Sequence, residues 1–176
     1  LKCSSSCSLE IIRCICMDER GWLSRIHVDW RQLQKAPSRI CANRTIVSTA
    51  VSYDWRALGW ASDELRSDRL LVSEALVQSG EAIKFAVREL REDRDLALKA
   101  VRCSPALEYV SKKLNGDREI VLEAVKSDGR QLEFAAEDLK GDKDIVLEAV
   151  KNTWQAIHFS SEAVRNDREI FIQAVR

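Results

Sequence analysis

Residues 120–126 read Ile-Val-Leu-Glu-Ala-Val-Lys, and the same seven residues return at 145–151, twenty-five positions later. This spacing extends along most of the chain, where a short polar residue recurs at steps of twenty-five, except for one step of twenty-four between Asp93 and Asp117. The recurring positions are Asp18, Asn43, Asp68, Asp93, Asp117, Asp142 and Asp167. A fixed period in this range is typical of stacked repeats, in which each unit is too small to bury a core alone.

The first half of each period predicts an α-helix of about ten residues. After Asp117, the apolar residues Ile120, Val121, Ala124 and Val125 fall at offsets of three, four, seven and eight, which places them on one helical stripe. An Asp or Asn at the first position can accept hydrogen bonds from the free N–H groups of the opening turn. The recurring polar residue is therefore interpreted as the N-cap.

The second half of each period predicts another helix, antiparallel to the first. Its N-cap column lies eleven residues after the first one and comprises Asp29, Asp54, Ser79, Ser104, Asp128 and Thr153. Apolar residues then follow at i, i+3 and i+7, as in Leu132, Ala135 and Leu139. In the shorter period the missing residue falls between Ser104 and Leu107, within the first turn of this helix.

These features predict an all-α fold, an α-solenoid of right- or left-handed sense built from stacked two-helix repeats of about 25 residues. Ordering one such unit costs roughly 25 to 50 kcal/mol of backbone entropy. Seven or eight buried apolar side chains return only about 1.5 to 3 kcal/mol each, so neighbouring units must share their apolar faces. An alanine column marks where helices should approach closely: Ala50, Ala75, Ala100, Ala124, Ala149 and Ala174.

The period also divides the chain. Residues 1–17 are rich in Cys and Ser and are expected to be disordered or a linker, and 18–42 form a degenerate first repeat that contains Pro37. The regular repeats span 43–176 as 43–67, 68–92, 93–116, 117–141, 142–166 and a partial unit, 167–176. Because the chain starts without Met and stops inside a repeat, we expect a piece of a longer repeat protein.

Two segments resemble a known family. Residues 117–126 (Asp-Arg-Glu-Ile-Val-Leu-Glu-Ala-Val-Lys) and 132–139 (Leu-Glu-Phe-Ala-Ala-Glu-Asp-Leu), with their copies, are similar to the tandem-repeat family called domain of unknown function 4116. The resemblance covers roughly Asn43 to Arg176. That family occurs in long arrays in microbial proteins and has no established activity. The resemblance therefore implies the architecture and no catalytic residue.

Composition limits the partners. The chain has 176 residues, 45% of them hydrophobic, and 28 basic residues balance 28 acidic ones. Such a chain carries no overall field to concentrate nucleic acid or an anionic membrane, and it has no apolar run long enough to span a bilayer. Four of the six cysteines lie within the first sixteen residues. Cysteines that do not recur with the repeat favour a reducing, cytoplasmic compartment.

Aromatic residues supply the first candidate surface. Trp30, Trp55 and Trp154 each follow the second N-cap at the edge of a repeat, where side chains are commonly half exposed, and they are the candidate contacts with a protein partner. Packing against a neighbouring loop is the alternative. A second aromatic column, interpreted as core packing rather than a base-stacking ladder, comprises Trp60, Phe85, Tyr109, Phe134 and Phe159.

Basic residues supply the second candidate surface, because one cation opens every first helix, where the helix dipole disfavours it. Ion pairs with the preceding acidic residues would explain this column, such as Arg94 with Glu89 and Lys143 with Asp138. Arg118 lacks such an acid, because Lys112 and Lys113 occupy those places. These three residues, Lys112, Lys113 and Arg118, are the candidate anion patch.

No catalytic, cofactor or metal site is expected. Cys3, Cys7, Cys14 and Cys16 lack the paired spacing of structural zinc sites, and His27 and His158 stand alone. The leading hypothesis is a non-enzymatic helical-repeat scaffold that mediates protein–protein interaction. The alternatives are a nucleic-acid-binding array, or a targeting region attached to an enzyme domain outside this sequence.

Overall fold

The computed structural model describes residues 18–175 of the chain. Residues 1–17, expected above to be disordered or a linker, lie outside the described residues. Every regular element within 18–175 is helical, and none is a strand. The fold divides into two units, one up to Ala75 and one from Leu76. The predicted all-α class, a solenoid of stacked helical repeats, is confirmed.

Each repeat opens with an α-helix, as predicted. These helices are α2 (Glu19–Val28), α4 (Arg44–Tyr53), α6 (Arg69–Gln78), α8 (Arg94–Cys103), α9 (Arg118–Ser127), α11 (Lys143–Asn152) and α13 (Arg168–Val175). The predicted N-caps of these helices are confirmed, whereas Thr153, predicted to cap the second half of its repeat, makes no side-chain cap bond. Asp117 Oδ1, for example, accepts from the N–H groups of Glu119 and Ile120 at 3.0 and 3.3 Å. The equivalent oxygens of Asp18, Asn43, Asp68, Asp93, Asp142 and Asp167 cap their own helices.

The second half of the repeat differs from the single continuous helix that the spacing predicted. It begins with a 3-10 helix, one of η1 (Trp30–Lys35), η2 (Trp55–Trp60), η3 (Gly80–Phe85), η4 (Leu107–Tyr109), η5 (Gly129–Phe134) and η6 (Trp154–Phe159). In most repeats a four-residue α-helix follows: α3 (Ser38–Cys41), α5 (Asp63–Arg66), α7 (Arg88–Arg91), α10 (Glu137–Lys140) or α12 (Glu162–Arg165). The apolar spacing of three residues, as from Leu132 to Ala135, fits one turn of a 3-10 helix equally well.

Two extended residues separate these short helices, and they connect one repeat to the one before it. After η5, Ala135 and Ala136 have φ near −65° and ψ near 150°. The freed Ala136 N–H donates to the carbonyl of Asn115 in the preceding repeat, at 2.9 Å. The same bond recurs from Ser62 to Cys41, from Ser111 to Arg91 and from Ser161 to Lys140. Breaking the helix thus supplies a backbone hydrogen bond between repeats.

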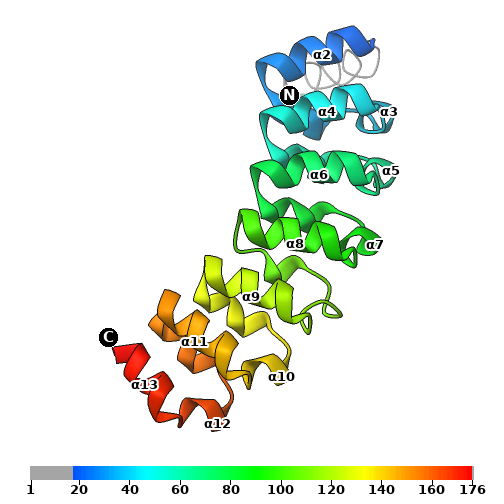
Figure 1. The fold of residues 1–176 in the computed structure, drawn as a ribbon. Helices are drawn as coiled ribbons and strands as arrows, with labels where there is room; N and C mark the ends of the chain where they lie inside the picture. Colours follow the sequence, from blue (N-terminus) through cyan, green and yellow to red (C-terminus); the bar gives the residue numbers. More distant parts are fainter. Residues whose placement is uncertain (1–17, 176) are drawn as a thin grey trace, which may run out of the picture. The chain divides into compact units, whose positions relative to one another are not determined.

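Within each unit, neighbouring repeats share one core. In the second unit α8, α9, α11 and α13 pack side by side in chain order, and in the first unit α2 packs against α4 (Figure 1). The alanine column lies in these contacts, since Ala100, Ala124 and Ala149 are fully buried. A Cβ placed on Gly129 would lie 2.2 Å from the Ala149 carbonyl oxygen. The close approach predicted for this column is thus made against the preceding repeat.

The repeat spanning 93–116 is irregular. Its 3-10 helix is the three-residue η4, and residues 112–116 form turns where other repeats have the short α-helix. Ser104 was predicted as an N-cap, but η4 begins only at Leu107, because one residue is missing and Pro105 intervenes. Gln131 of the next repeat, only 7% exposed, accepts a hydrogen bond from the Leu107 N–H at 3.0 Å. A side chain of the next repeat thus satisfies the uncapped turn.

Candidate functional site

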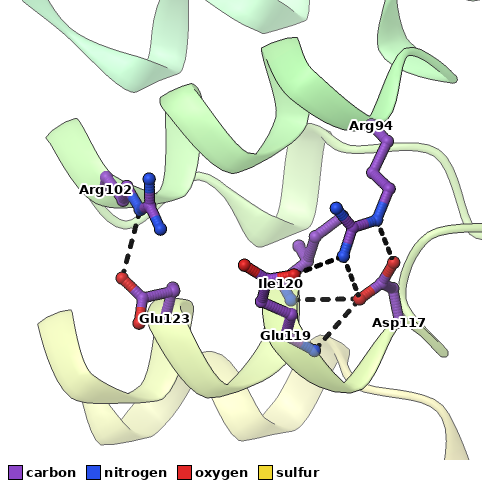
Figure 2. A network of polar contacts seen from close by, with 6 residues as sticks. All are labelled: Arg94, Arg102, Asp117, Glu119, Ile120 and Glu123. Carbon is purple, nitrogen blue, oxygen red and sulfur yellow. Dashed lines mark hydrogen bonds and ion pairs between the residues drawn. The ribbon is translucent and has the colours of Figure 1, made fainter.

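Ion pairs join the first turns of successive α-helices and account for the basic column. Arg94 Nε donates to Asp117 Oδ2 at 2.7 Å, and its Nη2 donates to Glu119 Oε2 at 2.5 Å (Figure 2). Asp117 is also the N-cap of α9, and the Arg94 guanidinium lowers the pKa of its carboxyl group. Further along α8, Arg102 Nε donates to Glu123 on α9 at 3.2 Å (Figure 2). The Asp117 carboxylate therefore caps its own helix and also forms an ion pair with the preceding repeat.

The same arrangement recurs along both units. Arg44 pairs with Asp68 at 2.7 Å in the first unit, and Lys143 pairs with Asp167 in the second. The predicted pairing of Arg94 with Glu89 and of Lys143 with Asp138 is therefore wrong. In these pairs, and in that of Arg94, the cation at the start of a helix reaches forward to the cap of the next helix, whose carboxylate lies beside it in the stack.

Arg118, placed in the candidate anion patch, takes part in this ladder. Its Nε lies 3.1 Å from Asp142 Oδ2 and its Nη2 lies 3.0 Å from Asp144 Oδ2. The side chain is about half exposed, and pairs of this kind contribute roughly 0 to 1 kcal/mol each. Two carboxylates thus face one guanidinium, and the structure gives Arg118 a role in the stack.

Lys112 and Lys113 lie elsewhere, in the turns of the irregular repeat. They line an open cavity of about 460 Å³, together with Arg88, Arg91 and Tyr109. Lys113 Nζ contacts Glu92 Oε2 at 2.7 Å, and Arg88 Nε contacts Glu92 Oε1 at 3.1 Å. Both bonds lower the pKa of the Glu92 carboxyl group, with Lys113 the larger cause. Sequence reasoning found the two lysines because they interrupt an acidic column, but it missed Arg88 and Arg91.

The three candidate tryptophans have different surroundings. Trp55 is only 9% exposed, with the Arg56 guanidinium 4.8 Å from its ring centre. Trp30 is half-buried, and its ring lies 5.4 Å from that of Trp60. Trp154 is 56% exposed, with His158 edge-on at 6.1 Å. Trp154 is thus the member of the set that presents most of its surface to solvent.

The second aromatic column is half-buried along its length. Lys84 Nζ lies 5.4 Å from the Phe85 ring centre and 5.2 Å from that of Tyr109. One cation thus contacts aromatic rings of two successive repeats. This geometry is that of packing between repeats, as the sequence analysis favoured.

Between residues 18 and 175, no group of three or more His, Cys, Asp or Glu side chains is arranged to hold a metal ion. No helix in that range has the length and apolar character needed to cross a membrane.

Stacked helical hairpins, joined by a recurring backbone bond and a recurring ion pair, define a tandem helical-repeat protein. The family model described as domain of unknown function (DUF4116) matches residues 68–115 and 117–165, which together make up more than half of the chain. The chain belongs to this family, as its repeats suggested. Comparisons with curated proteins and with solved structures found no match.

Proposed function

We propose that this chain is a non-enzymatic scaffold that binds another protein through the outer surface of its stacked repeats. The observation that carries the proposal is Trp154, whose side chain is 56% exposed on η6. Tryptophan is enriched among the few residues that dominate the energy of protein interfaces, since its ring offers a large apolar area with little rotamer freedom. An exposed Trp is therefore a good anchor for a partner.

The ion-pair ladder favours a protein partner over nucleic acid. Arg94 faces Asp117 and Glu119, and Arg118 faces Asp142 and Asp144, so each of these rungs carries an excess of one negative charge. Nucleic acid binding depends on cations that are free to neutralise phosphates. The basic column does not offer such cations along these helices, and the chain has no net charge.

The test is affinity capture from an extract of the protein's own cells, with and without nuclease treatment, followed by titration of each recovered protein against the purified chain. Three forms are compared: wild type, Trp154→Ala, and Val77→Ala as a control at another exposed apolar side chain. We expect Trp154→Ala to weaken the purified complex by about 2 kcal/mol, or roughly 30-fold, and Val77→Ala to leave it unchanged. Equal affinity of the two variants, or a partner that disappears with nuclease, contradicts the proposal.

A further inference from the structure

The cavity of the irregular repeat collects positive charge. Of the residues that line it, Arg88, Arg91, Lys112 and Lys113 are cationic and Glu108 is acidic. Its volume of about 460 Å³ falls within the range of small-molecule sites. Tyr109 and Ser111 add two hydroxyl groups to the lining. The cavity therefore offers several hydrogen-bond donors to a ligand of limited size.

The neighbouring carboxylates do not cancel this charge. Arg88 and Lys113 share the single carboxylate of Glu92, and Glu108 is the other acid at the cavity. Four cations and two carboxylates leave an excess of two positive charges. Arg91 Nε is shielded from solvent and has no hydrogen-bond partner. A ligand with two negative charges and several acceptor oxygens would complement this arrangement.

The two lysines are unfavourable for the local structure. Two other repeats place a pair of acids at these positions, Asp63-Glu64 and Glu137-Asp138, where a carboxylate suits the positive end of a short helix. The preceding repeat has Arg88-Glu89 there. Lys112 and Lys113 reverse that charge, and the segment forms turns instead of an α-helix. Departures from the local rules of a fold are expected where function requires them.

Neighbouring residues nevertheless preserve the irregular repeat. Gln131, where the other regular repeats have alanine, accepts from the Leu107 N–H, and Asn115 Nδ2 donates to the Phe134 carbonyl at 2.7 Å. Both bonds connect the irregular repeat to the one that follows it. These two hydrogen bonds to the next repeat thus stabilise the conformation of the shortened repeat. Such support is not expected of a segment that has only lost the sequence pattern of the repeats.

We propose that this cavity binds a phosphate monoester. A phosphate dianion matches the excess of two positive charges. Two of its oxygens can accept the paired N–H groups of one arginine guanidinium at the same time. Arg88, Arg91 and Lys113 line the cavity, and Lys112, which is exposed, adds a fourth cation to the lining. The phosphate is borne either by a phosphorylated side chain of a protein or by a free small molecule.

The experiment uses the whole chain and calorimetric titration with four probes. They are inorganic phosphate, phenyl phosphate, a phosphoserine peptide, and the same peptide with serine. We compare wild type with Lys112→Glu, which introduces the negative charge that three other repeats carry at this position (Asp63, Glu137 and Glu162), and with Lys151→Glu, an equal charge reversal on α11 outside the cavity. Circular dichroism checks that each variant folds, and Lys112→Gln serves in place of Lys112→Glu if that variant does not.

We expect saturable binding of the phosphate probes, weakened about tenfold or more by Lys112→Glu and by less than about threefold by Lys151→Glu. A phosphopeptide that binds at least tenfold more tightly than phenyl phosphate assigns the site to phosphorylated proteins. Equal affinities assign it to a free phosphate ester. The proposal is overturned if none of the phosphate probes binds, if the serine peptide binds equally well, or if both variants weaken binding alike.

Discussion

Replacing Gly129 by alanine tests the close contact on which the stack of the second unit depends. The added Cβ would lie 2.2 Å from the Ala149 carbonyl oxygen, 3.0 Å from the carbonyl carbon and 3.1 Å from Thr153 Cβ. Ordinary contacts of this kind begin near 3.4 Å. Since the blocking atoms belong to the backbone of α11, no rotamer change can relieve the clash, and the repeats must separate by about 1 Å.

The expected cost follows from two effects. Overpacking a dense contact typically costs about 1 to 3 kcal/mol. The shift would also strain the bond from the Gly129 N–H to Asn152 Oδ1, 3.3 Å long, which contributes roughly 1 kcal/mol. Gly129 does not have a positive φ, so backbone strain adds nothing. We therefore expect Gly129→Ala to lower the free energy of unfolding by about 2 to 4 kcal/mol.

Gly116→Ala is the matched control. A Cβ at Gly116 would meet only Ala136 Cβ at 3.8 Å, and this glycine has no positive φ either. The control should raise the free energy of unfolding by about 0.4 to 1 kcal/mol, because alanine restricts the unfolded chain. Urea unfolding followed by circular dichroism measures both changes. If the two variants have the same midpoint and slope, α11 does not approach Gly129 as closely as we describe.

Three further predictions concern the caps and the core. Arg94 lowers the pKa of Asp117, so this carboxylate stabilises the fold above its unfolded pKa of about 3.9, and the contribution is lost as pH falls through the lower folded pKa. Asp117→Asn, which retains a capping oxygen, should flatten the acid side of the stability–pH curve; an unchanged acid slope contradicts this. Trp55→Ala should cost about 3 to 5 kcal/mol in urea unfolding and Trp154→Ala less than about 1, whereas equal losses would mean equal burial. Ala124→Trp should lower the thermal unfolding midpoint by overpacking a fully buried site, and an unaltered midpoint would place Ala124 outside the contact.

The sequence was sufficient to predict the features that depend on one repeat alone. The first N-cap and the apolar stripe behind it are local, so Asp117 and the helix up to Ser127 could be derived from spacing and side-chain chemistry. The second helix could not, because its break at Ala135 and Ala136 contains neither Gly nor Pro. The break coincides with a hydrogen bond to Asn115 of the preceding repeat, which no pattern within the segment encodes.

The candidate site was only partly predictable for the same reason. Lys112 and Lys113 could be found because they interrupt columns that are acidic in several other repeats. Arg88 occupies the same column as Lys112 and is also basic, but only the stacking of α7 beside the irregular repeat shows that Arg88 and Arg91 reach the cavity. The ion pairs were assigned to the wrong partners because a period gives the distance between equivalent residues and not the direction in which a side chain points.

A constant period also does not require constant spacing between repeats. Gly80 and Gly129 leave no room for a Cβ, because the next helix brings its carbonyl group to about 2 Å from that point. Trp55 occupies the equivalent position in the first unit and is nevertheless accommodated, with only 9% of its surface exposed. A backbone carbonyl about 2 Å from this point excludes any Cβ, so an approach as close as that of α11 to Gly129 is incompatible with a tryptophan here. We therefore expect the residue at this position to limit how closely successive repeats can approach at that edge.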